Sequence, residues 1–232
     1  MNNSLLNATP FSGSAIRIDS QFRSLLVCCI KIYNDIIAKN KRTKNDEETI
    51  RDLFFDEYLN DDNYRNQNKE LEDFHFEKEP KENIGYLDIK AKKLNPYVST
   101  KAYFVIECKR LDSNNSTGET GLNAEYVKNG ICRFVTDYYS SYFECNAMFG
   151  FIVESVNVQN DIVDNINSML NKDFTLKTKK TSRIVNAKAT QVMQYVDFAN
   201  GYQYSYISKH TDISGKEIDL YHLMFDLSKN IQ

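Results

Sequence analysis

The chain has 232 residues, of which 41% are hydrophobic and 26% are charged, and its formal net charge at neutral pH is −3. This length and composition fit one well-packed globular domain and exclude a low-complexity chain. The small net charge also excludes the strongly basic surface of a non-specific nucleic-acid coat protein, although it leaves a nuclease possible.

The apolar runs and the cysteines indicate a cellular compartment. The longest apolar run is far shorter than the roughly 20 residues that a membrane span needs, and the N-terminus lacks the pattern of a secretory signal. The cysteines are odd in number and lack the paired spacing of a zinc site; they are Cys28, Cys29, Cys108, Cys132 and Cys145. We therefore expect a cytoplasmic protein with no membrane partner, in which the cysteines are buried as small hydrophobic side chains.

The pattern of apolar and polar residues in the N-terminal third predicts helices. Residues 1–14 are rich in Asn, Ser and Thr and are expected to form a loose arm. Asp19 or Ser20 can cap a helix whose apolar stripe runs from Phe22 to Ile37. The acidic residues 46–48 then predict the start of a second helix, and 60–68 predicts a polar loop. We expect residues 1–44 to form an arm and a helix packed on a main domain, residues 45–232, within one globular unit.

The pattern changes to strands after Phe74. Three strands of a meander are expected around Phe74 and Phe76, at 84–91 and at 102–111, with a turn at Asn95-Pro96. The following pattern predicts a helix at 122–139, a buried strand at 147–153, a helix at 162–170, and strands at 202–208 and 218–227. This order predicts an α/β fold in which helices flank a mixed β-sheet.

The stretch from Tyr103 to Leu111, Tyr-Phe-Val-Ile-Glu-Cys-Lys-Arg-Leu, contains the most informative polar residues. Because strand side chains alternate between faces, Glu107 and Lys109 share one face and Cys108 points to the other. If the strand at 84–91 pairs alongside, Asp88 can lie beside Glu107. Two carboxylates supply the hard oxygen ligands that Mg²⁺ prefers, and a lysine can orient a water or steady charge on a phosphate.

Glu-x-Lys alone is a weak signal in a charged chain. Glu79-Pro-Lys81 also matches, but proline is poor in a central strand. Asp88-Ile-Lys90 matches as well, but it lacks a strong apolar segment before it. On the residues alone, a Glu–Lys ion pair on a half-exposed sheet face remains an alternative to a metal site.

Gly-Tyr-Leu-Asp88-Ile, followed after a connection by Ile-Glu107-Cys-Lys109, resembles the PD-(D/E)xK nuclease superfamily. Leu87 stands where the proline of the family motif would be. The resemblance implies a restriction-endonuclease-like fold with a helical N-terminal addition. It also implies an Mg²⁺ or Mn²⁺ site at Asp88 and Glu107, with Lys109 as catalytic base or charge stabiliser. An acidic residue on the preceding helix often adds a ligand in that family, and Glu47 lies on the core-facing stripe of its helix.

The function implied by this resemblance is metal-dependent endonuclease cleavage of nucleic acid, with DNA expected rather than RNA, in a prokaryotic setting such as phage defence or restriction. The alternative is an inactive module on the same fold that binds nucleic acid or a partner protein. The long first helix could serve as the surface of a homodimer, and a partner subunit is the other possible protein partner.

Two further features are candidates for nucleic-acid contacts. A local basic cluster includes Lys179, Lys180 and Arg183 and could follow a phosphate backbone, or it could be a solvated strand edge. His210 follows a predicted strand and is the best functional candidate among the three histidines, whereas His222, in an apolar strand, is expected to be a satisfied core residue.

Overall fold

The computed structural model describes residues 12–82, 85–94, 103–116, 118–136, 145–177, 182–197 and 201–232. Its helices are α1 (Ser12–Ala38), α2 (Glu47–Phe54), α3 (Asp62–Gln67), α4 (Leu122–Tyr126), α5 (Cys132–Val135) and α6 (Asp164–Met169). Shorter helical segments continue or join them: η2 (Phe55–Leu59), η3 (Lys69–Leu71), η4 (Val127–Ile131) and η5 (Val158–Val163). No helix in these ranges is both long enough and apolar enough to cross a membrane.

The strands are β1 (Phe74–Lys78), β2 (Lys81–Glu82), β3 (Gly85–Tyr86), β4 (Ile89–Lys93), β5 (Tyr103–Leu111), β6 (Cys145–Ile152), β7 (Asp173–Lys177), β8 (Ser182–Asn186), β9 (Ala189–Tyr195), β10 (Ser205–Thr211) and β11 (Glu217–Asp226). Seven of them form one mixed sheet in the order β1-β4-β5-β6-β11-β10-β9. β5 and β11 both run parallel to β6, and the other pairs are antiparallel. The expected α/β class with a mixed sheet is confirmed, as is the meander of β1, β4 and β5.

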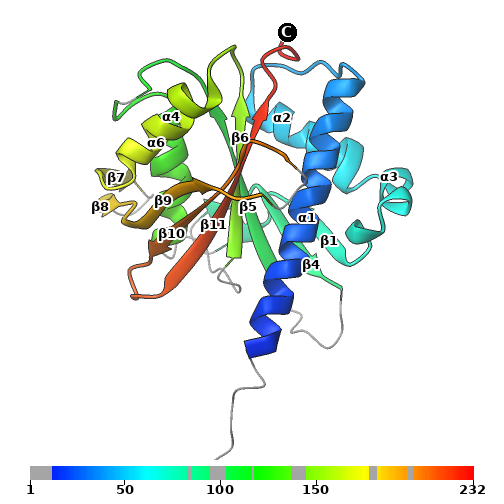
Figure 1. The fold of residues 1–232 in the computed structure, drawn as a ribbon, viewed down its shortest axis with the longest axis horizontal. Helices are drawn as coiled ribbons and strands as arrows, with labels where there is room; N and C mark the ends of the chain where they lie inside the picture. Colours follow the sequence, from blue (N-terminus) through cyan, green and yellow to red (C-terminus); the bar gives the residue numbers. More distant parts are fainter. Residues whose placement is uncertain are drawn as a thin grey trace, which may run out of the picture.

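Helices cover both faces of this sheet (Figure 1). On one face, α1 and α2 pack on the alternate residues Phe104, Ile106 and Cys108 of β5. On the other face, α4, α5 and α6 pack against a second cluster that includes Val105. The period-2 alternation of β5 therefore divides the core into two layers, as the sequence predicts.

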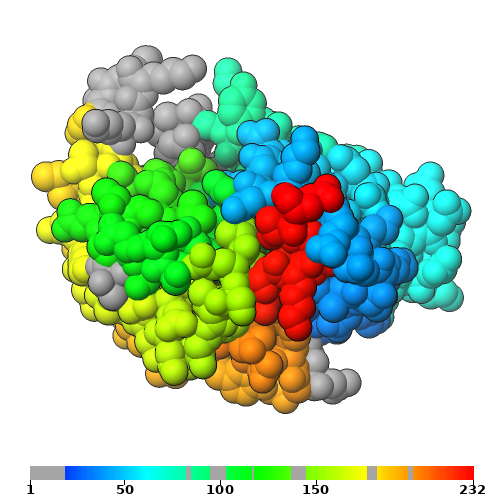
Figure 2. All heavy atoms as spheres, turned by 90° about the horizontal axis from the view of Figure 1, so that it is seen from above, coloured from blue at the N-terminus to red at the C-terminus, as the bar shows by residue number. Residues whose placement is uncertain are grey.

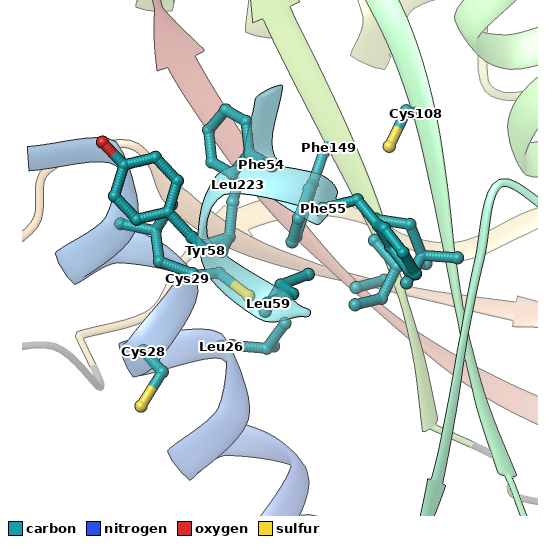
Figure 3. Close-up of a cluster of buried hydrophobic side chains, with 14 of the residues drawn as sticks. Leu26, Cys28, Cys29, Phe54, Phe55, Tyr58, Leu59, Cys108, Phe149 and Leu223 are labelled. Carbon is teal, nitrogen blue, oxygen red and sulfur yellow. The ribbon is translucent and has the colours of Figure 1, made fainter. Parts of the chain in front are cut away.

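The α1 face of the core is largely aromatic and aliphatic. The ring of Phe22 from α1 stacks on Phe104 with centroids 4.3 Å apart. Figure 3 shows how α2 and η2 fill the layer between α1 and the sheet, with Leu59 beside Leu26, and Phe54 toward Phe149. All five cysteines are free thiols. The expected burial is confirmed for Cys28, Cys29, Cys108 and Cys132, whereas Cys145 is half-buried.

The C-terminal residues are tied to the connection between α1 and α2. Thr43 pairs with Ile231 in a parallel bridge, and its backbone N–H donates to the carbonyl of Asn230 at 3.0 Å. Figure 2 shows the C-terminal segment in red set against this N-terminal connection in blue. The connection that leads into α2 is therefore held to the C-terminal segment at Thr43.

Several expected boundaries were wrong. The first helix begins at Ser12, not at Asp19 or Ser20, so residues 12–14 of the expected loose arm are helical. Inside this helix the Asp19 carboxylate accepts a hydrogen bond from Tyr221 Oη at 2.6 Å and pairs with Arg23 at 2.8 Å. The expected loop at 60–68 contains α3, which Asp61 caps through the backbone N–H of Tyr64. Strands β7, β8 and β9 were not predicted, and the expected turn at Asn95-Pro96 lies outside the described residues.

Candidate metal and phosphodiester site

The strand β5 places Glu107 and Lys109 on the face covered by α4 and α5. Glu107 is fully buried and Lys109 is 7% exposed. The pairing of Ile89 with Ile106 sets Asp88, one residue before β4 begins, opposite Glu107. The expected single strand at 84–91 is interrupted at this point, and the Asp88 carboxylate accepts a hydrogen bond from the backbone N–H of Cys108 at 2.7 Å. Asp88 is thus fixed to the backbone of the strand that carries its partners.

The N-terminus of α2 supplies the third carboxylate. Asp46 caps this helix by accepting from the backbone N–H of Thr49 at 2.9 Å, so that Glu47 is its first residue. Glu47 Oε1 accepts from Lys109 Nζ at 2.9 Å, and Glu47 Oε2 accepts from the backbone N–H of Arg110 at 3.2 Å. Glu48 is exposed. The structure therefore brings Glu47, Asp88, Glu107 and Lys109 together from three separate segments.

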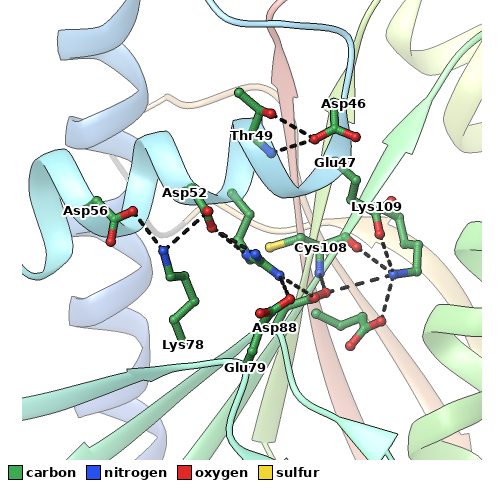
Figure 4. Close-up of polar contacts among 12 residues, drawn as sticks. Asp46, Glu47, Thr49, Asp52, Asp56, Lys78, Glu79, Asp88, Cys108 and Lys109 are labelled. Carbon is green, nitrogen blue, oxygen red and sulfur yellow. Dashed lines mark hydrogen bonds and ion pairs between the residues drawn. The ribbon is translucent and has the colours of Figure 1, made fainter.

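The ammonium group of Lys109 lies at the centre of these groups (Figure 4). Besides Glu47, its Nζ donates to Glu107 Oε1 at 2.8 Å and to the backbone carbonyl of Cys108 at 2.7 Å, and it lies 3.9 Å from Asp88 Oδ2. Burial alone would lower the pKa of Lys109, but the attraction of Glu107, Asp88 and Glu47 outweighs it and leaves the pKa raised. Lys109 is therefore a protonated cation at neutral pH in this arrangement.

Two arginines that the sequence analysis missed also pair with these carboxylates. The buried Arg51 donates through Nη1 to Asp88 Oδ1 at 3.4 Å and to Glu79 Oε1 at 3.0 Å. Arg133, on α5, donates to Glu107 Oε1 at 2.7 Å. Arg51 could have been found, because it lies four residues after Glu47 and so shares its helix face. No spacing in the sequence identifies Arg133.

The pKa of the Asp88 carboxyl is raised above its ordinary value. Burial, and then the nearby charge of Glu107, raise its pKa to about 6, although Lys109, the Cys108 N–H and Arg51 act in the opposite direction. A carboxyl with a pKa raised by burial and by a second carboxylate is typical of a functional cluster, although structural ion pairs can do the same.

The donor set suits a hard divalent cation. Asp88 Oδ2 and Glu107 Oε1 lie 3.9 and 2.8 Å from one nitrogen, so their separation cannot exceed the sum of these distances. Two oxygens that share one ion lie within about 5 Å of each other, so at most a small movement of the side chains would let both carboxylates bind one ion. Three carboxylates and a backbone carbonyl are oxygen ligands of the kind Mg²⁺ and Mn²⁺ take. Within the described ranges, no three His, Cys, Asp or Glu side chains are already arranged around a common metal position. The chemistry fits a metal, and the ammonium group fills the space between the oxygens.

The basic residues expected to contact nucleic acid lie elsewhere. Lys179 and Lys180 are outside the described residues. Arg183 is exposed on β8, where it lines a groove of about 430 Å³ together with Asp173, Lys188 and Asp212. None of the described contacts of Asp88, Glu107 or Lys109 involves Arg183, so its role in nucleic-acid binding stays a prediction.

His210 is fully buried, and both of its ring nitrogens have partners. Its Nε2 lies 2.6 Å from Ser208 Oγ and its Nδ1 lies 2.7 Å from the carbonyl of Ala187. Ser208 Oγ also lies 2.7 Å from His222, whose other nitrogen contacts Tyr126 Oη at 2.8 Å. This placement leaves His210 no surface for nucleic acid, because it belongs to a buried hydrogen-bonded chain. The expectation for His222 as a satisfied core residue is confirmed.

Replacing Ser208 with Ala should destabilise the protein by about 2 kcal/mol, because it leaves two buried imidazole nitrogens without their partner. Burial lowers the pKa of His210 to about 4, so protonation cannot compensate at neutral pH. Urea denaturation at pH 7 measures the effect, with the exposed Ser182→Ala as control. A loss no larger than that of the control would show that the chain of contacts contributes nothing to stability.

Comparisons with known proteins found no match for this chain. No protein-family model matches the chain, and neither the curated proteins nor the solved structures give a match.

Proposed function

We propose that this protein is a metal-dependent nuclease of the PD-(D/E)xK type with a restriction-endonuclease-like fold, and that it hydrolyses phosphodiester bonds in nucleic acid, with DNA as the expected substrate. The observation that carries the proposal is that three carboxylates lie within 3.9 Å of the ammonium nitrogen of Lys109. They come from three segments: Glu47 from α2, Asp88 from the residues before β4, and Glu107 from β5. The order α2, β1, β4, β5, α4–α5, β6, with β6 parallel to β5, supports the fold assignment.

The cluster is accessible to solvent from one side. The exposed fractions of the side chains decrease from 32% for Glu47, through 16% for Asp88, to 0% for Glu107. A phosphate group would therefore approach along the Glu47 side, while Glu107 forms the floor. Arg133, whose side chain is 24% exposed, lies at the same floor through its contact with Glu107.

The residues would divide the chemistry among them. Asp88, Glu107 and Glu47, with the Cys108 carbonyl, would hold a divalent cation, which when bound polarises a phosphate and lowers the pKa of a bound water. Lys109 can donate hydrogen bonds to a phosphate oxygen and stabilise the negative charge that develops there. Because the pKa of Lys109 is raised, a charge-stabilising role is favoured over the role of general base, which needs a neutral amine.

The rival function is a non-catalytic module of the same fold that binds nucleic acid or a partner protein. The same ammonium contacts favour it, because a carboxylate cluster fully paired with lysine is also a stable ion-pair arrangement.

A cleavage assay separates the two functions. The wild type should cut supercoiled, linear or single-stranded DNA, or RNA, in Mg²⁺ or Mn²⁺ and lose this activity in EDTA. Asp88→Asn, purified in the same way, excludes a contaminating nuclease, and Asp164→Asn, on the exposed side of α6, is the matched control that should retain activity. If no substrate is cut with either metal, the protein is a non-catalytic module.

A further inference from the structure

Lys109 occupies a position that is chemically a cation-binding site. Its ammonium nitrogen lies within 2.9 Å of an oxygen from each of Glu47, Glu107 and the Cys108 backbone, and 3.9 Å from Asp88. The side chain is 9% exposed, so these protein oxygens replace most of its water. Hard divalent ions seek the same type of oxygen environment, at metal–oxygen distances of about 2.0 to 2.6 Å.

The other two cations of the cluster do not share this position. Among the three carboxylates, Arg51 pairs with Asp88 and Arg133 pairs with Glu107. Lys109 is the described cation that contacts all three. Its removal would therefore empty the centre of the cluster, whereas removal of Arg133 would take away the same charge and leave the centre filled.

An ammonium group and a divalent ion cannot both occupy this centre. Their separation would be a few ångströms in a largely dry site, where like charges repel strongly. The four-carbon stem of lysine is flexible, so the ammonium can leave while the backbone of β5 stays in place. The phosphate of a bound nucleic acid would offer the ammonium a new anionic partner.

We propose that Lys109 is an internal cation that closes the metal site in the metal-free protein, and that a divalent ion binds only when the ammonium group moves out. This inference rests on the proposed function, because it concerns the same site. It makes metal binding an exchange of one cation for another, so the wild type binds metal more weakly than its oxygen ligands alone would allow.

Calorimetric titration of the nucleic-acid-free protein with Mn²⁺ and with Ca²⁺ tests the exchange without any measurement of cleavage. Lys109→Met keeps most of the side-chain volume and removes the charge. Its affinity for either ion should exceed that of the wild type by about tenfold or more, because the competing cation is gone. Arg133→Met, which makes the same change in net charge, should bind no more than about threefold more tightly than the wild type.

Thermal unfolding provides the second measurement, since Lys109→Met leaves carboxylates without their cation. The increase in Tm on adding Ca²⁺ should be larger for Lys109→Met than for the wild type. Lys109→Gln, which keeps a hydrogen-bond donor, serves if the methionine variant does not fold. Folding of either variant only when metal is present would also support the exchange.

The possible failures are distinguishable. If the wild type binds metal and the Lys109 variants bind it equally or more weakly, the exchange is wrong and the proposed nuclease site remains. If Lys109→Met and Arg133→Met tighten binding equally, the effect is one of net charge and the exchange is again wrong. If neither wild type nor variants bind either ion at millimolar concentration, the exchange and the metal-dependent function both fail.

Discussion

The Lys109→Met variant is expected to cleave nucleic acid about a thousandfold more slowly than the wild type, even at metal concentrations that saturate both proteins. Stabilisation of developing charge by one positioned donor contributes about this factor in enzymes. The ammonium lies 2.8 Å from Glu107 and 3.9 Å from Asp88 in the metal-free protein. When it moves away from these carboxylates, its flexible stem keeps it within reach of a phosphate beside a metal ion that they hold. Single-turnover cleavage in saturating Mn²⁺ measures the chemical step.

Lys90→Met is the matched control for this variant. Lys90 follows Asp88 by two residues, as Lys109 follows Glu107, and is the lysine of the competing Asp-x-Lys pattern. Its Nζ lies over the ring of Tyr103, 3.7 Å from the centroid, and not among the carboxylates. Lys90→Met should cleave at nearly the wild-type rate. Equal losses in the two variants would mean that the assignment of Lys109 to the chemistry is wrong.

The central part of the site could be predicted because β5 has an unusually clear pattern. Phe104 and Ile106 on one face, and Val105 on the other, fix the alternation, so Glu107 and Lys109 had to share a face. Once the neighbouring strand pairs in antiparallel register, Asp88 is the carboxylate opposite Glu107. The helical stripe places Glu47 on the core-facing side of its helix, and Glu47 is the residue that contacts Lys109.

Arg51 shares the helix face of Glu47 and could have been predicted from that spacing. The contact of Arg133 could not, since it depends on how a helix lies on the sheet. Arg133 lies on α5, which follows α4 and the π-helical segment Val127–Ile131 in one continuous helical stretch. One extra residue in such a segment turns the following side chains to another direction, so a regular helical period cannot place Arg133.

Two of the unpredicted strands, β8 and β9, share a physical cause. β8 buries Val185 alone among its residues, and β9 buries Met193 alone. Strands at an edge or in a two-stranded sheet need little apolar surface, so their sequences lack the alternation that marks a strand. The pairing that holds them is between backbones, and residue types encode it only weakly.

The Arg51→Met variant is expected to be less stable than the wild type by about 3 kcal/mol at pH 8 in the absence of metal. The Arg51 side chain is 4% exposed and Asp88 is 16% exposed, so its removal leaves a largely buried carboxylate short of a cation. Burial of Arg51 opposes its charge, yet its contacts with Asp52, Asp88 and Glu79 leave its pKa raised, so Arg51 is charged throughout the accessible pH range.

The pH dependence of this loss identifies Asp88 as its source. The pKa of Asp88 is already raised to about 6 by burial and Glu107, and without Arg51 it must rise further. Below that pKa the carboxyl is neutral, so the missing cation has no buried charge to compensate. The difference in unfolding free energy between wild type and Arg51→Met should therefore be largest at pH 8 and should shrink as the pH falls to 5.

Urea unfolding at pH 5 and pH 8, in EDTA, measures this difference, with the exposed Arg183→Met as the control for loss of a surface arginine. A double variant, Arg51→Met with Asp88→Asn, should recover stability at pH 8, because the amide removes the uncompensated charge. If the loss instead stays constant between pH 5 and 8, Arg51 stabilises the protein by packing α2 on β1 and not by holding the Asp88 carboxylate.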